Sequence, residues 1–441
     1  MKIGLVAMSG VRADDPELTA IGLTLPGFVE RSEIIASLPS LGLLTLAALT
    51  PPEVEVEYVE LPDLSAVDGL PGEFDLVAIS SWSAQIADAY ALSARYRAAG
   101  VPTVLGGWHV SVLPGEARAH ADSIVIGDGE PLWPQVVADF AAGRLQPEYR
   151  LSAGRQYDLA LSPVPRYELL DPARYNRLTV QTSRGCPHRC EFCGGGVVID
   201  PHYRVKPVER IIAEVRRIRE VWPHAFIEFA DDNSFVHRGH ARHLLHALRD
   251  EGVKWFTEVD VSIADDPELL DLMRESGCRQ VLIGLESPTA DGLWGLELKD
   301  NWKLRRQPDY EAAVRTIQDH GIKVDGCFIL GLDGHDESVF EGISDFVDRT
   351  GLYDVQLTVL TPFPGTPLYA RLEREGRLIS PGAWSKCTLF DINFVPRAMS
   401  PERLRQGLID LARHVYDKDG RSARQRAFVE HWLHRDERPA T

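Results

Sequence analysis

Three cysteines, Cys186, Cys190 and Cys193, lie within eight residues in a C-x3-C-x2-C spacing. Thiolates this close together are typical ligands of zinc or of an iron–sulfur cluster. A cluster held by three thiolates keeps one open iron, which can bind a small chelating ligand. The alternative is a zinc site completed by His188 or His202, because zinc accepts three cysteines and one histidine.

The stretch from Arg184 to Cys193 has an aromatic residue, Phe192, directly before its last cysteine. It resembles the cluster loop of radical S-adenosylmethionine (SAM) enzymes. The resemblance implies that the three cysteines hold a [4Fe–4S] cluster, whose fourth iron binds the amino and carboxylate groups of SAM. One electron then cleaves SAM to methionine and a 5′-deoxyadenosyl radical, which removes a hydrogen from the substrate. The three cysteines are therefore the expected metal ligands and catalytic residues.

Composition sets limits on the class of protein. The chain has 441 residues, 44% hydrophobic and 25% charged, which is typical of a soluble protein with two or three domains. Its formal net charge of −18 disfavours nucleic acid and anionic membranes as partners. Six cysteines, three of them clustered, indicate a reducing compartment. No stretch approaches the ~20 apolar residues of a membrane span. We expect a cytoplasmic protein with no membrane partner.

Strand-like and helix-like segments must position these residues, and in residues 1–140 they alternate. Alternation of this kind predicts a doubly wound, Rossmann-like parallel sheet of the α/β class. Ligands of such sheets bind outside the carboxyl ends of the strands, where glycines let a flat ligand approach the backbone. The expected strands are 3–8, 54–61, 76–80, 103–105 and 123–126, and the expected helices are 41–49 and 86–99.

The segments Leu38–Leu43, Ile79–Ser81, Leu105–His109 and Ile126–Glu130 resemble the cobalamin-binding domain that precedes many radical SAM domains. The implied cobalamin contacts are Ser80, Ser81, Trp82, Gly106, Gly107, Trp108, His109, Gly127, Gly129 and Glu130. The chain has no Asp-x-His-x-x-Gly motif, so cobalamin is expected to lack the lower histidine ligand of relatives that carry it.

Two of these residues have alternative interpretations. Trp108 is expected either to pack on a corrin face or to be an ordinary core aromatic. His109 is expected either to be a hydrogen-bonded loop histidine or to contact the tail of the corrin.

Residues 141–175 are rich in proline and glycine breakers, which predicts a linker. About six β/α units follow over residues 176–380 and predict a partial (β/α)6 radical SAM barrel, with its active site at the carboxyl ends of the strands. Residues 381–441 contain two amphipathic helical patterns, which predict a helical C-terminal extension that covers the barrel.

Polar or glycine residues end several of the predicted barrel strands. They could be helix caps, acid–base catalysts or ligands of a divalent metal. The family resemblance implies instead that they contact SAM, and the implied SAM-binding residues are Phe192, Asp231, Asp232, Glu286, Ser287, Ile329 and Gly331. Cys278, Cys327 and Cys387 are expected to be small buried hydrophobic residues, although Cys327 or Cys387 could be a thiol in the pocket.

The resemblances imply a cobalamin-dependent radical SAM methyltransferase that acts on an unactivated carbon of a small-molecule or natural-product intermediate. The expected cofactors are the [4Fe–4S] cluster, SAM and cobalamin. The expected partners are a small-molecule substrate and an electron donor such as flavodoxin or ferredoxin. One alternative is another radical rearrangement, cyclisation or oxidation, with a structural N-terminal domain. A zinc-binding interaction protein is the other alternative.

Overall fold

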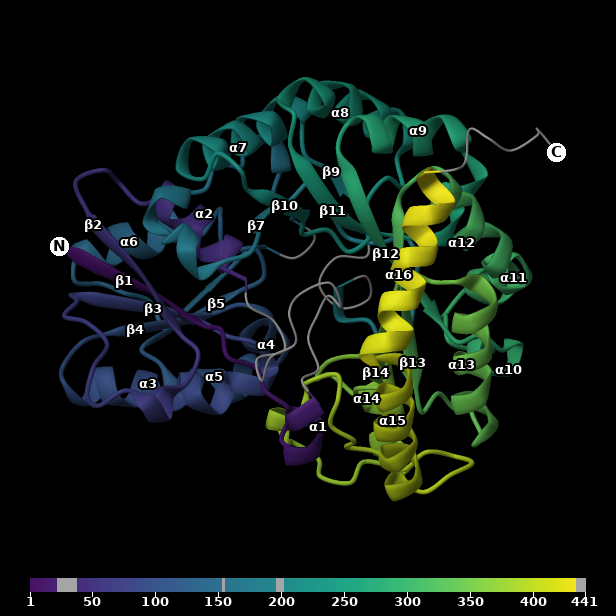
Figure 1. The fold of residues 1–441 in the computed structure, drawn as a ribbon. Coiled ribbons are helices and arrows are strands. Elements are labelled where there is room, and N and C mark those ends of the chain that lie inside the picture. Colours follow the sequence, from purple (N-terminus) through teal and green to yellow (C-terminus); the bar gives the residue numbers. More distant parts are fainter. Residues whose placement is uncertain (22–37, 153–154, 196–201, 434–441) are drawn as a thin grey trace.

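The computed structural model describes residues 1–21, 38–152, 155–195 and 202–433, and Figure 1 shows two parallel sheets joined along the chain. The first sheet has the strand order β2-β1-β3-β4-β5-β6. Its strands are β1 (Lys2–Met8), β2 (Glu55–Leu61), β3 (Leu76–Ser80), β4 (Thr103–Gly106), β5 (Ser123–Ile126) and β6 (Glu148–Arg150). The predicted linker therefore contains an edge strand, β6, whose three residues Glu-Tyr-Arg carry no apolar run that could have revealed it.

Helices cover both faces of this sheet, which confirms the doubly wound fold (Figure 1). Helices α2 (Leu41–Leu49) and α6 (Trp133–Ala141) lie on one face, and α3 (Ile86–Ala98), α4 (Trp108–Val112) and α5 (Pro114–Ala117) lie on the other. The buried strands are nearly continuous apolar runs, as expected for parallel strands packed on two sides. Trp133 is 1% exposed, and its Nε1 donates to Thr50 Oγ1 at 2.8 Å, which fastens α6 to the end of α2.

The second sheet has the order β14-β13-β12-β11-β10-β7, with all neighbouring strands parallel. Its strands are β7 (Leu178–Val180), β10 (Phe226–Phe229), β11 (Lys254–Val259), β12 (Cys278–Glu286), β13 (Lys323–Leu330) and β14 (Asp354–Val359). Helices α7 (Val208–Val221), α8 (Arg238–Glu251), α9 (Pro267–Glu275), α12 (Tyr310–Asp319) and α13 (Ser338–Thr350) lie outside it. This confirms the predicted partial (β/α)6 barrel.

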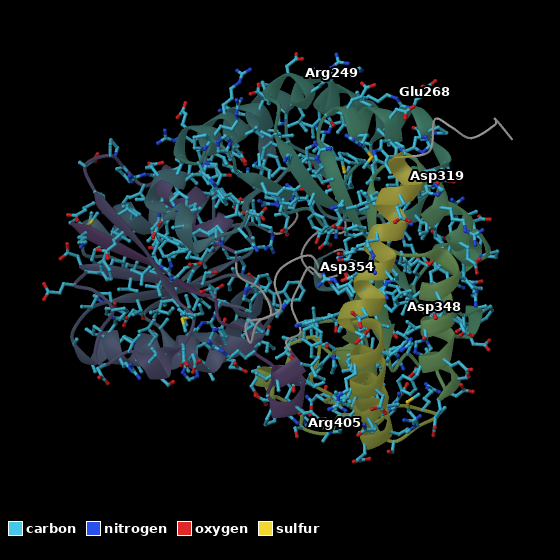
Figure 2. All side chains as sticks on the ribbon, in the orientation of Figure 1. Arg249, Glu268, Asp319, Asp348, Asp354 and Arg405 are labelled. Atoms are coloured by element: carbon cyan, nitrogen blue, oxygen red, sulfur yellow. The ribbon has the colours of Figure 1, made fainter. Side chains whose placement is uncertain are left out.

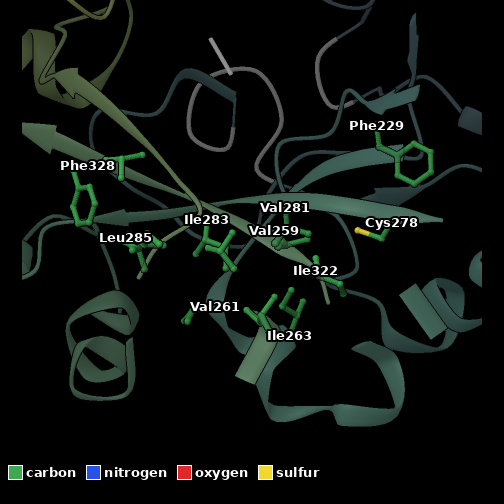
Figure 3. Packing of buried hydrophobic residues seen from close by; sticks show 14 of the residues in the cluster. Phe229, Val259, Val261, Ile263, Cys278, Val281, Ile283, Leu285, Ile322 and Phe328 are labelled. Carbon is green, nitrogen blue, oxygen red and sulfur yellow. The ribbon is translucent and has the colours of Figure 1, made fainter. Parts of the chain in front are cut away.

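The packing of β12 shows how the barrel sorts its side chains. Val281, Ile283 and Leu285 are fully buried against the outer helices, as Figure 3 shows. Because side chains alternate along a strand, Gly284 faces the interior of the barrel. A Cβ on Gly284 would stand 2.5 Å from Glu286 Oε1, so the Glu286 carboxylate lies on the same side, although the strand is irregular between the two residues. The strand thus packs its apolar side chains outward against the helices, and at its carboxyl end it places a polar residue, Glu286, inside the barrel.

The C-terminal helices α15 (Pro401–Val415) and α16 (Lys418–Leu433) lie along β14 and the last barrel helices (Figure 1). Arg421 Nη2 donates to Asp354 Oδ2 at 2.8 Å, and Asp354 is fully buried under α16 (Figure 2). Arg405 of α15 binds Asp15 and Glu17 at α1 (Pro16–Ile21), so the extension also holds the N-terminal region. Among the described residues, no helix combines the length and the apolar character that a membrane span requires.

Candidate active site

The cysteine loop leaves the barrel at the carboxyl end of its first strand. It is flanked by a short antiparallel pair, β8 (Ser183–Arg184) and β9 (Arg204–Val205). Cys186 and Cys190 are buried, with exposures of 9% and 5%, and Cys193 is half-buried. Burial raises the pKa of Cys186 to about 12 and raises that of Cys190 further. The thiols therefore keep their protons until a metal replaces them.

A second segment pairs with this loop and fixes its shape. Glu191 N donates to Leu296 O at 2.9 Å, and Leu298 N donates to Arg189 O at 2.8 Å. Between these bonds, Cys190 forms an isolated antiparallel bridge with Glu297. The position of Cys190 is thus set by a backbone ladder to a segment more than 100 residues away.

The two histidines considered as zinc ligands are engaged elsewhere. His188 Nε2 lies 3.2 Å from Asp260 Oδ2, and its Nδ1 lies 3.6 Å from Glu297 Oε1. His202 Nδ1 lies 3.2 Å from Gln156 Nε2. Across the described ranges, no three histidine, cysteine or acidic side chains form a group that could hold a metal ion, and this holds for the three loop cysteines in their present arrangement as well as for the two histidines. The structure therefore gives neither histidine the place of a fourth ligand.

A cavity of about 800 Å³ lies between the carboxyl ends of the first sheet and the cysteine loop. The predicted cobalamin contacts that line it are Ser80, Trp82, Gly106, Gly107, Trp108, Gly127, Gly129 and Glu130. The opposite wall contains Gln181, Arg184, Gly195, Asp232 and Gly365. One cavity thus joins the strand-end loops of the first sheet to the cysteine loop of the barrel.

Open space lies above two glycines of the first wall. A Cβ atom at Gly42 or Gly127 would meet no atom within 4 Å. Gly127 also has a φ of +84°, a left-handed conformation that favours glycine. A flat ring system such as the expected corrin could therefore lie directly against the backbone here.

Trp108 lies where the two walls meet. A Cβ on Gly194 would stand only 2.2 Å from the Trp108 ring, so this glycine leaves the room that the indole occupies. Gly194 directly follows Cys193, which places Trp108 against the end of the cluster loop. Trp108 also lines the cavity, and its packing on a corrin face stays a prediction.

His109 does not line this cavity. It is fully buried, with Nδ1 3.1 Å from Ser83 Oγ and Nε2 3.1 Å from Glu116 Oε1. Trp384 Nε1 donates to Glu116 Oε2 at 3.1 Å, so this network ties the first sheet to the C-terminal region. The structure thus gives His109 the hydrogen bonds of the first interpretation, and a contact with the tail of the corrin stays a prediction. Ser81 also lies outside the cavity lining, with its Oγ buried.

Arg184 joins the two walls of the cavity. Its Nη1 donates to Asp128 Oδ1 at 2.8 Å, and its Nη2 donates to Glu130 Oε1 at 2.7 Å. The two carboxylates follow β5 in the first sheet, whereas Arg184 directly precedes the cysteine loop. Glu130 was predicted to contact cobalamin, and its pairing with Arg184 was not predicted.

Asp231 braces the strand that leads into the cysteine loop. It accepts hydrogen bonds from Thr182 N at 2.7 Å, Ser183 N at 2.9 Å and Ser234 Oγ at 2.7 Å, and also from Thr182 Oγ1. A carboxylate offers about four acceptor sites, so these donors fill it. These bonds give Asp231 a role in positioning the loop, and its expected contact with SAM stays a prediction.

Asp232, in contrast, is exposed within the cavity. Its Oδ2 accepts from Gly185 N at 3.0 Å, directly before Cys186. Its Oδ1 lies 2.1 Å from the position that a Cβ on Gly195 would take. Asp232 therefore touches both ends of the cysteine loop and remains a candidate SAM contact.

Glu286 is paired with a buried cation that the sequence analysis did not single out. Lys303 Nζ donates to Glu286 Oε1 at 2.8 Å and to Gly284 O at 2.7 Å. Glu286 is 6% exposed and has a φ of +61°, which is rare for a residue with a side chain. The nearby carboxylate raises the pKa of Lys303 well above its usual value, and the ammonium in turn favours a thiolate at Cys190.

The remaining predicted SAM contacts have mixed surroundings. Ser287 is fully buried and lies 2.9 Å from His335 Nε2. Ile329 is 7% exposed within β13, and Phe192 is a half-buried residue that packs against the barrel core. A Cβ at Gly331 would lie 2.8 Å from Phe394 and from Leu404, so the C-terminal region requires this glycine.

Family comparison supports the sequence resemblance. Residues 180–347 match the radical SAM superfamily, and residues 366–441 match a domain of unknown function. The chain is 28% identical to a bacteriochlorophyllide d C-12(1)-methyltransferase of Chlorobaculum tepidum, over 85% of this chain and 82% of that protein. It is 30% identical to a hopanoid C-2 methylase of Rhodopseudomonas palustris, over 79% of this chain and 66% of that protein.

Two solved structures share this fold over nearly the whole chain. One is the radical SAM methyltransferase TsrM from Kitasatospora setae, solved with tryptophan and a SAM analogue, with a TM-score of 0.68 and 16% identity. The match covers 99% of this chain and 98% of that one. The other is the cobalamin-dependent radical SAM enzyme OxsB with aqua-cobalamin and SAM, with a TM-score of 0.68 and 14% identity. It covers 99% of this chain and 71% of that one.

Proposed function

Because this chain belongs to the radical SAM superfamily, we propose that it is a cobalamin-dependent methyltransferase that acts on an unactivated carbon of a small molecule. The observation that carries the proposal is the shared cavity. Its first wall holds eight of the ten residues predicted for cobalamin, and its second wall adjoins the three cysteines predicted for the cluster. The relatives named above are methyltransferases or cobalamin-dependent enzymes by name.

The residues of the loop fit an iron–sulfur cluster. Cys186, Cys190 and Cys193 offer three soft sulfur donors, and iron–sulfur clusters are held by such donors. When bound, the cluster supplies the electron that cleaves SAM, and cobalamin carries the methyl group. Lys303 places a buried ammonium near Cys190, where it favours the thiolate that ligation requires.

The first wall has the residue types that a corrin ring could lie against. Gly106, Gly107, Gly127 and Gly129 expose backbone to the cavity, and Trp108 offers an aromatic face beside them. Arg184 would hold this wall in register with the cysteine loop through its pairs with Asp128 and Glu130. In this proposal the glycines receive the ring, and Arg184 positions it opposite the cluster.

For SAM, we propose contacts with Asp232 and Glu286. Lys303 already balances the charge of Glu286, so this pair presents acceptor atoms and little net charge. The hydroxyl groups of a ribose are therefore a better match for Glu286 than the positive sulfonium. Asp232 lines the cavity and accepts a hydrogen bond from Gly185 N directly before Cys186, and a carboxylate in this place suits the ammonium group of SAM.

The remaining assignments are also proposals. SAM cleavage consumes one electron, so an external donor such as flavodoxin or ferredoxin would reduce the cluster. A cytoplasmic location agrees with six cysteines that form no disulfide. We retain the division into a cobalamin-binding domain (1–140), a linker (141–175), a barrel (176–380) and an extension (381–441), with β6 as the linker's contribution to the first sheet.

Anaerobic reconstitution with iron, sulfide and hydroxocobalamin, followed by desalting, tests this proposal. We expect about four irons and one corrin per chain, with broad absorbance from the cluster. A protein that keeps the cluster but no corrin would remove methyl transfer and leave another radical reaction. A colourless protein that binds one zinc would remove both, and the zinc-binding alternative would stand.

A further inference from the structure

A second, smaller cavity of about 310 Å³ adjoins the first. It shares Trp82, Trp108 and Gly195 with the larger cavity and also touches Gly194. Gly194 and Gly195 directly follow the last cysteine of the loop. The smaller cavity therefore lies beside both the predicted cluster and the predicted corrin, and no cofactor was assigned to it.

The walls of this cavity are apolar and partly aromatic. They include Val11, Trp82, Trp108, Phe363 and Leu389, which come from the first sheet, the loop after β14 and the C-terminal region. Trp82 is 61% exposed, which is unusual for so large an apolar side chain. Three aromatic rings around one space favour an occupant with a flat ring of its own.

The polar side chains of the lining direct their hydroxyl groups elsewhere. Ser83 Oγ lies 3.1 Å from His109 Nδ1. Thr388 Oγ1 donates to Asp391 Oδ2 at 2.6 Å and accepts from Asp391 N at 3.1 Å. Burial raises the pKa of Cys387 to about 12, so its thiol is neutral. Among the described lining residues there is no charged side chain, and a charged occupant would lose its hydration without compensation.

One residue of the lining, Trp108, carries a donor without an acceptor. The Nε1–H of Trp108 is buried and has no hydrogen-bond partner within the described part of the chain. Buried donors are nearly always paired in native proteins, because an unpaired one loses its hydration. An occupant that carries a carbonyl or hydroxyl oxygen would supply the missing acceptor.

The wall formed by the C-terminal region is held under strain. Leu389 has a φ of +72°, although it is not a glycine, and its carbonyl accepts from Val359 N at 2.7 Å. Non-glycine residues in this conformation persist where their surroundings fix them, often at ligand sites. Strand β14 therefore fixes a leucine side chain of the extension at the edge of this cavity.

We propose that this cavity binds the ring-containing body of the methyl acceptor, a neutral apolar molecule with an oxygen acceptor for Trp108. The proposal rests on the proposed function and specifies its substrate class. It also assigns part of the substrate specificity to residues 387–389 of the C-terminal region. A cavity of this volume is at the small end of ligand pockets, so the enclosed part is a compact ring body.

Equilibrium dialysis against the reconstituted holoenzyme tests the substrate class with four probes that share one ring system. The probes are 2-acetylnaphthalene, naphthalene, 2-naphthoate and 2-naphthylmethylammonium. We expect 2-acetylnaphthalene to bind about fivefold more tightly than naphthalene, because it accepts one hydrogen bond. We expect both charged probes to bind more weakly than naphthalene. Equal or tighter binding of either charged probe would overturn the proposal.

Two variants locate the probe. Trp108→Phe keeps an aromatic ring and removes the donor, so the preference for 2-acetylnaphthalene over naphthalene should disappear. Leu389→Trp should block binding of both neutral probes, whereas Leu70→Trp, at an exposed leucine away from the cysteine loop, should not. An unchanged preference in Trp108→Phe, or unchanged binding in Leu389→Trp, would overturn the proposal.

The same samples separate this inference from the proposed function. Retained corrin and iron in each variant show that the protein is folded and loaded. If the loaded holoenzyme binds none of the neutral probes, the substrate inference fails alone. If corrin is not retained, the methyltransferase proposal fails, and the dialysis of the cluster-loaded protein still decides whether the apolar cavity binds these probes.

Discussion

Arg184 offers the most direct test of how the two walls of the large cavity are held together. It reaches from the strand before the cysteine loop to Asp128 and Glu130, which follow β5 of the first sheet. We predict that Arg184→Gln weakens cobalamin binding, although the substitution leaves every cysteine in place. The variant keeps an amide donor but leaves two carboxylates facing each other without a cation.

The magnitude follows from burial and geometry. Arg184, Asp128 and Glu130 are 18%, 15% and 13% exposed, so the charges are partly screened by water. Breaking a fully buried pair costs about 3–5 kcal/mol, whereas an exposed pair is worth less than about 1 kcal/mol. We therefore expect the free energy of cobalamin binding to become about 2 kcal/mol less favourable. This corresponds to a roughly 30-fold higher dissociation constant.

A double-mutant cycle by equilibrium dialysis of hydroxocobalamin measures this effect. Glu130→Gln alone should weaken binding by about fivefold, because it keeps an acceptor oxygen. The double variant should bind no more weakly than Arg184→Gln alone, since both changes remove the same interaction. Arg150→Gln, which disrupts an exposed pair with Glu148, is the matched control and should stay within about twofold.

Two results would refute this reasoning. Additive effects of Arg184→Gln and Glu130→Gln would show that each side chain contacts cobalamin separately and that they do not act as a pair. Unchanged binding in Arg184→Gln would show that the ion pairs do not hold the cavity walls in register.

Three further predictions concern residues around this site. Lys303→Met should lower the free energy of unfolding by about 3 kcal/mol and reduce the iron retained, because it leaves the Glu286 carboxylate buried without a cation. Lys299→Met, at an exposed lysine, should do neither, and equal losses in the two variants would contradict the reasoning. Burial lowers the pKa of His335 to about 4 from 6.5, so the contribution of its neutral form to stability is complete above pH 6.5 and is lost as the pH falls. Between pH 7 and pH 5 we expect urea titrations to show a loss of about 2 kcal/mol in the free energy of unfolding that His335→Gln does not show. Equal losses in the wild-type protein and the variant would contradict this prediction. Gly42→Leu should weaken cobalamin binding about tenfold, because its side chain would enter the open space above α2, while SAM cleavage continues; unchanged cobalamin binding would contradict this placement of the ring.

The sequence indicated the two sheets well, because their strands are buried on both faces. Segments such as Ile79 and its neighbours in β3 read as apolar runs, and the helices between strands showed the expected spacing. The glycines at strand ends also indicated the cavity, since the carboxyl ends of parallel strands gather at one edge. Strand β6 was missed because its residues are polar and only its pairing with β5 defines it.

The partners of individual side chains could not be predicted. Arg184 meets Asp128 and Glu130 only because the two sheets face each other, and no local pattern encodes that orientation. Lys303 lies on a short helix, α11 (Trp302–Arg306), where a lysine would ordinarily be expected in solvent. The burial of Lys303 is explained only by its ion pair with Glu286, which lies inside the barrel.

Two residues predicted to contact SAM have structural constraints that the sequence did not reveal, for similar reasons. Asp231 ends a strand, as a ligand-binding aspartate would, but the neighbouring strand supplies backbone donors that fill its carboxylate. Gly331 must be glycine because Phe394 and Leu404 of the C-terminal region approach it closely. Both outcomes depend on contacts between segments that are distant in the sequence.

The formation of 5′-deoxyadenosine from SAM by the anaerobically reconstituted protein tests the central claim most directly. We predict that the wild-type protein and Cys278→Ala, a change in the barrel core, form it in the presence of a strong one-electron reductant. We predict that Cys186→Ala, Cys190→Ala and Cys193→Ala each form none. Formation of 5′-deoxyadenosine above the background without protein by any of these three variants would contradict the account.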